Sequence, residues 1–183
     1  MIQIPYTRTI LFITCLWILV RLFFWYCDKK VSLKRELELI LVYICLVVVA
    51  RFTFFPFSKV NGQVQPLLFD AANIFPPRIN LLPVVYLMNY EIRREAWINV
   101  IGNTSMFVPI GIIWPSVFGQ LDTSSKAIGA GFGFSLFIEI LQLPFFDRVT
   151  DIDDLLLNSL GFILGYGIFR FVKKLSHNKK CEA

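Results

Sequence analysis

Charged and amide side chains recur inside or beside the apolar stretches of this sequence, at spacings that suit a shared polar site. In lipid, each one costs on the order of 3 kcal/mol unless it is paired or faces water, so its position is informative. The candidate site residues are Arg51, Asn80, Asn99, Asn103, Glu139, Gln142, Arg148, Asp151, Asp153, Asp154 and Asn158. Their carboxylate and guanidinium groups suit two chemistries, the binding of a polar headgroup and the coordination of a divalent cation.

Two segments place polar residues on a single helical face. Ser135, Glu139 and Gln142 recur at i, i+4 and i+7, as side chains on one face of a helix do. Asn99 and Asn103 are likewise spaced at i and i+4. We expect a buried network or a binding site around Glu139, because an acid one to two turns inside an apolar segment needs partners.

Arg51 and Arg148 provide the cations of the predicted site. A guanidinium group binds phosphate through two parallel hydrogen bonds, so these residues are expected to engage the phosphate of a polar headgroup. The lipid tail of such a ligand would lie between helices. This arrangement predicts recognition of an amphiphile.

A second chemistry is suggested by Asp151-x-Asp153-Asp154, whose carboxylates are suitable ligands for a divalent cation such as Mg²⁺. A membrane enzyme that acts on a lipid-linked pyrophosphate would use them in this way. Consecutive helical positions do not all point one way, however, and the one histidine, His177, lies in the C-terminal tail. The residues therefore favour a non-enzymatic role without excluding an enzyme, and no cofactor is expected outside this alternative.

Each polar residue also has a purely structural explanation. Asp151 and Asp154 stand at the start of an expected helix, where a carboxylate can cap free N–H groups. Arg51 lies near the end of an apolar segment, where arginine often extends to the headgroup region. Asn99 and Asn103 could hydrogen-bond between helices without binding a ligand.

The elements that must position these residues are membrane-spanning helices. Of the 183 residues, 56% are hydrophobic and only 17% are charged, which is more apolar surface than one compact soluble core hides. Five apolar stretches approach the roughly 20 residues needed to cross a bilayer. They are residues 9–27, 37–57, 97–118, 126–146 and 152–172. The sequence therefore predicts an all-α fold, a polytopic membrane helix bundle of about five transmembrane helices, as a single domain over residues 1–183.

Lysine and arginine residues indicate the orientation in the membrane. Ten of them lie on the side that would face the cytoplasm, and six are spread over a longer length of chain on the other side. Because basic loops tend to stay in the cytoplasm, the N-terminus is predicted outside and the C-terminus inside. The net charge of +5 requires no nucleic acid partner, because anionic lipid lies beside the basic tail.

Several other residues are assigned packing roles. Arg21, deep in the first apolar stretch, is expected to reach the headgroups or to pair two helices. The four cysteines show no CxxC spacing, so neither a disulfide framework nor a zinc site is expected. The glycines predicted to allow close helix packing are Gly129, Gly131, Gly133, Gly161 and Gly165.

Three runs of the sequence form a specific joint pattern, namely Asn99-x-x-Gly102-Asn103-x-x-x-Phe107-x-Pro109-x-Gly111, Glu139-x-x-Gln142 and Arg148-x-x-Asp151-Ile152-Asp153-Asp154-x-x-x-Asn158-x-x-Gly161. Together these runs resemble the VanZ-like family of membrane proteins. Arg51-Phe52-Thr53 and Asn80-Leu81-Leu82-Pro83 also match, so the resemblance covers about residues 51–171. The resemblance implies a bacterial plasma-membrane protein, of the kind whose namesake lowers susceptibility to teicoplanin, a glycopeptide with a lipid tail.

The resemblance and the polar residues together predict a protein that binds or remodels an amphiphile at the outer leaflet. The expected partners are membrane lipid and either the lipid-tailed glycopeptide or a lipid-linked cell-wall precursor. Two alternatives remain, the metal-dependent enzyme described above and a small lipid transporter. Five spans without a visible repeat suit alternating access only if the chain oligomerises, and the sequence does not indicate the oligomeric state.

Overall fold

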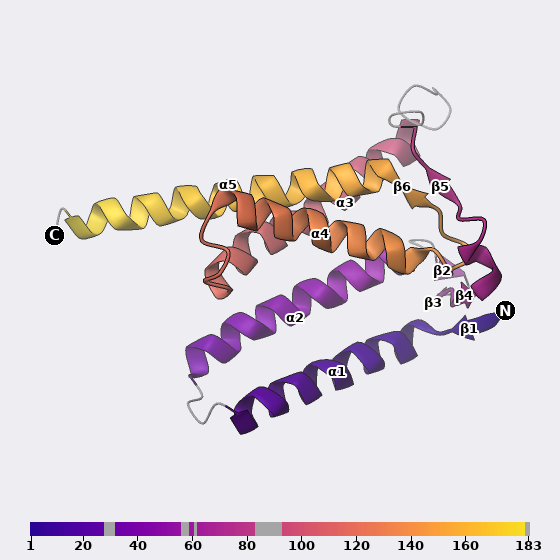
Figure 1. The fold of residues 1–183 in the computed structure, drawn as a ribbon, viewed down its shortest axis with the longest axis horizontal. Helices are drawn as coiled ribbons and strands as arrows, with labels where there is room; N and C mark the ends of the chain where they lie inside the picture. Colours follow the sequence, from indigo (N-terminus) through magenta and orange to yellow (C-terminus); the bar gives the residue numbers. More distant parts are fainter. Residues whose placement is uncertain (28–31, 56–58, 61, 83–92, 182–183) are drawn as a thin grey trace. The chain divides into compact units, whose positions relative to one another are not determined.

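The computed structural model describes residues 1–27, 32–55, 59–60, 62–82 and 93–181. Within these ranges, five helices are long and apolar enough to cross a membrane, which confirms the predicted all-α membrane fold. They are α1 (Tyr6–Cys27), α2 (Leu33–Phe54), α3 (Arg93–Val117), α4 (Ser124–Gln142) and α5 (Ile152–Cys181) (Figure 1).

The chain divides into two compact units that alternate along the sequence. The first unit comprises Met1–Arg78 and Leu141–Val149, and the second comprises Ile79–Ile140 and Thr150–Ala183. Most of the predicted site residues belong to the second unit. The prediction that the whole chain forms one membrane domain stays a prediction.

Proline sets two helix ends. α2 ends at Phe54, and Phe55 is extended (φ −110°, ψ 140°), as is usual for a residue that precedes proline. The last residues predicted for this span, 56–57, lie outside the described ranges. α4 ends at Gln142 rather than at residue 146, because Pro144 lacks the N–H group that a continuing helix needs. α5 instead continues to Cys181, beyond the predicted end at residue 172.

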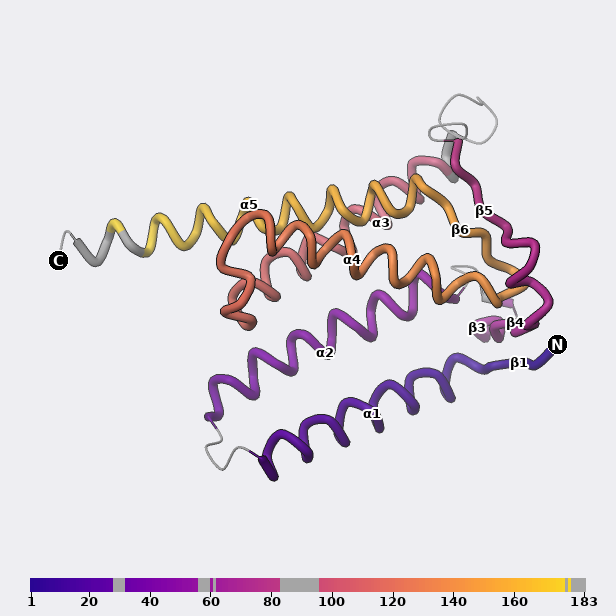
Figure 2. Tube along the Cα trace, in the orientation of Figure 1, coloured from indigo at the N-terminus to yellow at the C-terminus, as the bar shows by residue number. Residues whose placement is uncertain are grey.

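Short strand pairs occur between the helices, and the sequence did not predict them. The antiparallel pairs are β1 (Ile2–Ile4) with β4 (Leu67–Phe69) and β2 (Lys59–Val60) with β3 (Gln63–Val64). In the second unit, β5 (Ile79–Asn80) pairs in parallel with β6 (Thr150–Asp151), and the Cα trace in Figure 2 shows β6 leading directly into α5. A short 3₁₀ helix, η1 (Ala71–Ile74), lies between β4 and β5. Strands of two or three residues are too short to carry an alternating pattern in the sequence.

In the first unit, polar contacts join α1 to α2. Arg21 pairs with Glu36 through both Nε, at 3.2 Å, and Nη2, and Trp25 Nε1 donates to the same carboxylate at 3.0 Å. The hydroxyl groups of Thr14 and Tyr43 form a further hydrogen bond of 2.7 Å. Arg21 therefore pairs two helices, which is one of the two roles expected for it.

In the second unit, α3 and α5 pack closely at glycines. A Cβ atom added to Gly161 would overlap the backbone carbonyl oxygen of Thr104, and one added to Gly165 would overlap that of Val108. Gly111 on α3 faces the backbone of α5 just as closely. The predicted close packing is confirmed for Gly161 and Gly165, since side chains at these positions would force the backbones apart.

The glycines of α4 behave differently from one another. A Cβ atom at Gly131 would overlap the ring of Phe162, whereas Gly129 and Gly133 have no described atom within 4 Å of that position. The close-packing prediction is therefore confirmed for Gly131 and stays a prediction for Gly129 and Gly133. Residues two apart on a helix point to nearly opposite sides, so three glycines at this spacing cannot all face one neighbour.

An aromatic cluster forms part of the core of the second unit. The Trp114 ring lies 4.9 Å from that of Phe134 and 6.2 Å from that of Phe162, and Phe107 lies 5.7 Å from Phe134. Phe107 and Phe162 are fully buried. Because these rings come from α3, α4 and α5, their packing fixes the three helices that carry the polar residues.

Candidate functional site

Glu139 belongs to a polar network in the second unit. The residue is 2% exposed, and its Oε2 accepts a hydrogen bond of 3.1 Å from the backbone N–H of Asp151. Its backbone carbonyl accepts a bond of 2.9 Å from Thr150 Oγ1. Both donors belong to β6, so Glu139 holds the segment that leads into α5 against α4.

Asp154 joins α5 to α3. Its Oδ1 accepts hydrogen bonds from Asn99 Nδ2 at 3.1 Å and from Asn103 Nδ2 at 2.6 Å. Asn103 Nδ2 also lies 2.6 Å from Asn99 Oδ1, so the two amides and the carboxylate form one group. The interhelical bonding suggested for Asn99 and Asn103 is confirmed, and a ligand-binding role for them stays a prediction.

Asp151 is the N-cap of α5. Its Oδ1 accepts a hydrogen bond of 2.9 Å from the backbone N–H of Asp153, a donor that has no partner within the helix itself. Its Oδ2 accepts a bond of 3.1 Å from Asn80 Nδ2, which ties β6 to β5. The capping explanation is therefore correct for Asp151, whereas Asp154 uses its carboxylate between helices.

A second polar layer lies one helical turn from Glu139 and Asp154. Asn158, which is 1% exposed, donates from Nδ2 to Ser135 Oγ at 3.1 Å. Its Oδ1 is buried and has no hydrogen-bond partner among the described residues. Sequence analysis placed Ser135 on the face of Glu139 without including it in the site. It missed Thr150 altogether, because an isolated hydroxyl between two elements carries no positional signal.

The polar residues described so far are called the polar network of the second unit, and the charged groups among them are acidic. They are Asn80, Asn99, Asn103, Ser135, Glu139, Thr150, Asp151, Asp154 and Asn158. The carboxylates of Asp151 and Asp154 act electrostatically on Glu139, and no ion pair within the described part of the chain involves Glu139. The other members of the network contribute amide and hydroxyl groups. These side chains together offer many acceptors and a few amide donors, so they complement hydroxyl, amide and ammonium groups better than phosphate.

The three remaining candidate residues belong to the first unit, where they cap the C-terminal end of α2. The last carbonyl groups of a helix lack partners within it. Three successive carbonyls here accept bonds from side chains. The pairs are Gln142 Nε2 with Thr53 O at 2.7 Å, Arg148 Nε and Nη2 with Phe54 O at 3.0 and 2.8 Å, and Arg51 Nη1 with Phe55 O at 3.1 Å.

These capping contacts give the two arginines a structural role. The Arg51 guanidinium also lies over the rings of Tyr6, at 5.6 Å, and Phe52, at 5.4 Å. Positive charge at the C-terminus of a helix complements the helix dipole, so both guanidinium groups stabilise α2. Their engagement of a phosphate group stays a prediction, as does a single pocket that contains all the candidate residues.

The alternative prediction of a divalent cation uses Asp151, Asp153 and Asp154. Within the part of the chain that the structure describes, no group of three or more histidine, cysteine, aspartate or glutamate residues could hold a metal ion. Asp151 and Asp154 direct oxygen atoms at amide donors instead. A divalent cation at these carboxylates stays a prediction. The described cysteines, Cys15, Cys27 and Cys45, are free.

This chain is similar in sequence to known membrane proteins. Residues 40–173 match the family model described as VanZ/LLP1, and this range contains every predicted site residue. A stretch of 81 residues is 36% identical to the uncharacterized membrane protein YwnJ of Bacillus subtilis (strain 168), covering 44% of this chain and 54% of that protein. The chain thus spans about half the length of this curated relative. No solved structure shows a significant match.

Proposed function

The chain belongs to the VanZ-like family, and on this premise we propose that it lowers susceptibility to lipid-tailed glycopeptide antibiotics such as teicoplanin. It is a multi-pass membrane protein, and its proposed location is the bacterial plasma membrane. In this proposal, the polar network of the second unit binds the polar part of an amphiphile. The two candidate amphiphiles are the glycopeptide itself and a lipid-linked cell-wall precursor.

The observation that carries the proposal is the buried Glu139 carboxyl group. No ion pair to it occurs among the described residues, and its one side-chain hydrogen bond comes from a backbone N–H. A buried acid of this kind is costly within a membrane helix, and a single side-chain hydrogen bond offsets only part of that cost, which favours a functional reason for it. Glycopeptides and wall precursors carry hydroxyl, amide and ammonium groups, which carboxylates and amides bind.

The depth of the network also supports a headgroup ligand. α4 ends at Gln142, one turn beyond Glu139, and α5 begins at Ile152, just before Asp154. At about 1.5 Å per residue, both side chains lie within roughly one turn of the helix ends. A polar headgroup can reach this depth while its lipid tail extends between helices. In the predicted orientation, this end of the helices belongs to the outer leaflet, where the antibiotic meets the membrane.

Antibiotic susceptibility of a sensitive Gram-positive host that expresses the full chain tests the proposal. We expect the inhibitory concentration of teicoplanin to rise and that of vancomycin, which lacks a lipid tail, to stay unchanged. Glu139→Gln should abolish the protection at an equal amount of membrane-inserted protein, because it removes the carboxylate and preserves the size of the side chain.

Glu38→Gln is the matched control. It makes the same chemical change on α2, at a partly exposed carboxylate whose ion pair with Arg35 is 3.9 Å long. This variant should protect as well as the wild-type chain. Full protection by the Glu139 variant would disprove the binding site. Absence of protection by the wild-type chain, at verified membrane levels, would contradict the proposed function itself.

A further inference from the structure

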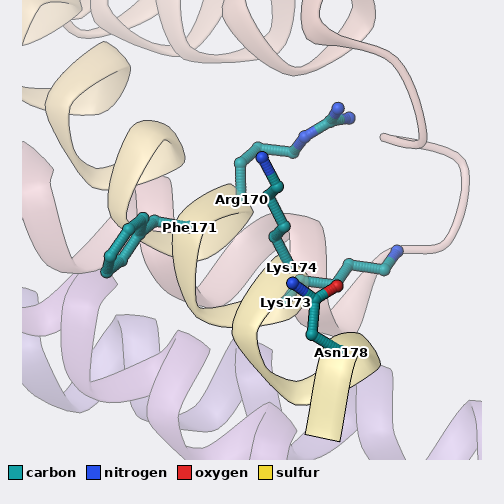
Figure 3. Close-up of a pocket in the computed structure, with 5 residues that line it drawn as sticks. All are labelled: Arg170, Phe171, Lys173, Lys174 and Asn178. Atoms are coloured by element: carbon teal, nitrogen blue, oxygen red, sulfur yellow. The ribbon is translucent and has the colours of Figure 1, made fainter. Parts of the chain in front are cut away.

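The last turns of α5 carry a second polar feature, at the opposite end of this helix from Asp154. A cavity of about 530 Å³ is lined by Arg170, Phe171, Lys173, Lys174 and Asn178. Figure 3 shows that all five side chains project from α5. The cations and the amide are spaced at i, i+3, i+4 and i+8, which places them close together on the helix surface. The proposed glycopeptide site uses none of these residues.

The cavity carries three cationic side chains, those of Arg170, Lys173 and Lys174. No ion pair within the described ranges involves Arg170, Lys173 or Lys174. Arg170 Nη1 lies 3.5 Å from the Tyr166 hydroxyl, and Lys173 Nζ lies 5.7 Å from the ring centroid of Phe169. These contacts orient the long side chains but supply no negative charge. The cavity therefore concentrates three positive charges.

The position of the cavity along α5 points to a lipid ligand. The apolar part of α5 that is long enough to span a bilayer runs over Ile152–Ser176, so the three cations occupy its last two turns. Lysine and arginine at this position extend their charged groups to headgroup level and lay their stems along the apolar layer. Phe171, which is 63% exposed, offers an apolar surface to the glycerol or acyl part of a lipid.

We propose that this cavity binds the headgroup of an anionic membrane lipid that carries two phosphates, as cardiolipin does. The Arg170 guanidinium suits bidentate contact with one phosphate, and Lys173 and Lys174 add point charges for the second. Asn178 adds an amide donor. An ordinary phosphodiester headgroup has one negative charge, so a headgroup with two phosphates matches the three cations better.

Lipid retention at equal surface charge tests this proposal. The full chain is reconstituted in phosphatidylcholine nanodiscs that contain either cardiolipin or twice the mole fraction of phosphatidylglycerol. Native mass spectrometry after extraction in detergent counts the anionic lipids that each protein retains. We expect at least about tenfold greater retention of cardiolipin, because its second phosphate pairs with cations that a single phosphodiester leaves unmatched. Equal retention of the two lipids would overturn the proposal.

Two sets of variants test whether the cavity residues account for the retention of cardiolipin. Arg170→Gln combined with Lys173→Gln and Lys174→Gln should reduce cardiolipin retention to that of phosphatidylglycerol. The charge-preserving set, Arg170→Lys with Lys173→Arg and Lys174→Arg, should retain most of it. Unchanged retention in the glutamine variant would overturn the proposal. If that variant does not fold, Asn178→Ala alone must lower cardiolipin retention for the proposal to stand.

The matched control removes three positive charges from other helices. Arg8→Gln, Lys34→Gln and Lys126→Gln change exposed residues of α1, α2 and α4. This triple variant should retain cardiolipin as the wild-type chain does. An equal loss in the control and in the cavity variant would overturn the proposal, because retention would then depend on net charge rather than on the cavity.

Discussion

At the scale of single residues, the carboxylate of Asp154 joins two helices and also belongs to the candidate site. Its Oδ1 accepts hydrogen bonds from the amides of Asn99 and Asn103, which lie on another helix. Hydrogen bonds to a charged acceptor contribute about 1.5 to 3 kcal/mol each, more than bonds between neutral groups. The charge of Asp154 therefore stabilises the contact between α5 and α3.

Asp154→Asn should lower the free energy of unfolding by about 1 kcal/mol, because a neutral amide oxygen accepts weaker hydrogen bonds than a carboxylate. The melting temperature of the purified protein in detergent should fall by about 2 to 4 °C. Asp147→Asn is the control, since Asp147 is exposed and lies between α4 and β6. Equal melting temperatures for both variants would show that the Asp154 charge does not stabilise the fold.

At the scale of elements, the contact between α3 and α5 depends on glycines that allow the two backbones to approach. Gly161 and Gly165 of α5 face carbonyl oxygens of α3, whereas Gly167 of the same helix has no described atom within 4 Å of its Cβ position. Within membranes, close packing of this kind takes the place of the hydrophobic effect in holding helices together. α5 therefore contains glycines at which an added methyl group would overlap the neighbouring helix, and Gly167, at which it would not meet a described atom.

Gly161→Ala should destabilise the protein by about 1 to 3 kcal/mol, because the added methyl group overlaps backbone atoms that cannot move aside. Gly167→Ala should leave stability unchanged or raise it by up to about 1 kcal/mol, since alanine is the better helix former. Thermal unfolding of both variants in the same detergent measures the difference. Equal stability of the two alanine variants would contradict the close contact between Gly161 of α5 and the backbone of α3.

At the scale of the whole molecule, five spans require the two termini to lie on opposite sides of the membrane. The hydropathy and length of the five described helices support this count. Basic residues predict that the N-terminus is outside. The proposed function depends on this orientation, because it assigns the polar network of the second unit to the outer leaflet.

Single cysteines in a chain without native cysteines test the orientation. Gln3→Cys, in β1, should react with a membrane-impermeant maleimide on intact cells. Ser176→Cys, near the end of α5, should react only after the cells are permeabilised, because the last span carries it to the cytoplasm. Labelling of both positions from outside would contradict five spans. The reverse pattern would contradict the orientation and the outer-leaflet site.

The sequence by itself determined the five spans and the helical faces that carry the polar residues. Span length and hydropathy are local properties, so five apolar stretches were enough to predict α1 to α5 to within a few residues at most ends. The spacing of Asn99 and Asn103 likewise predicted one face of α3, because helical geometry relates residues four apart without any tertiary contact. α2 and α4 end before Pro56 and Pro144 for a similarly local reason, although the predicted spans continued past both prolines to residues 57 and 146.

Only the tertiary structure decided which partner each polar group takes. The guanidinium of Arg148 is suited to phosphate and to carbonyl oxygen alike, and the fold brings it to the carbonyl of Phe54, 94 residues away in the sequence. Asp151 and Asp154 are equally suited to capping, yet the first caps α5 and the second binds α3. A hydrogen-bonding group accepts many partners of similar energy, so its choice depends on what the folded chain places within about 3 Å of it.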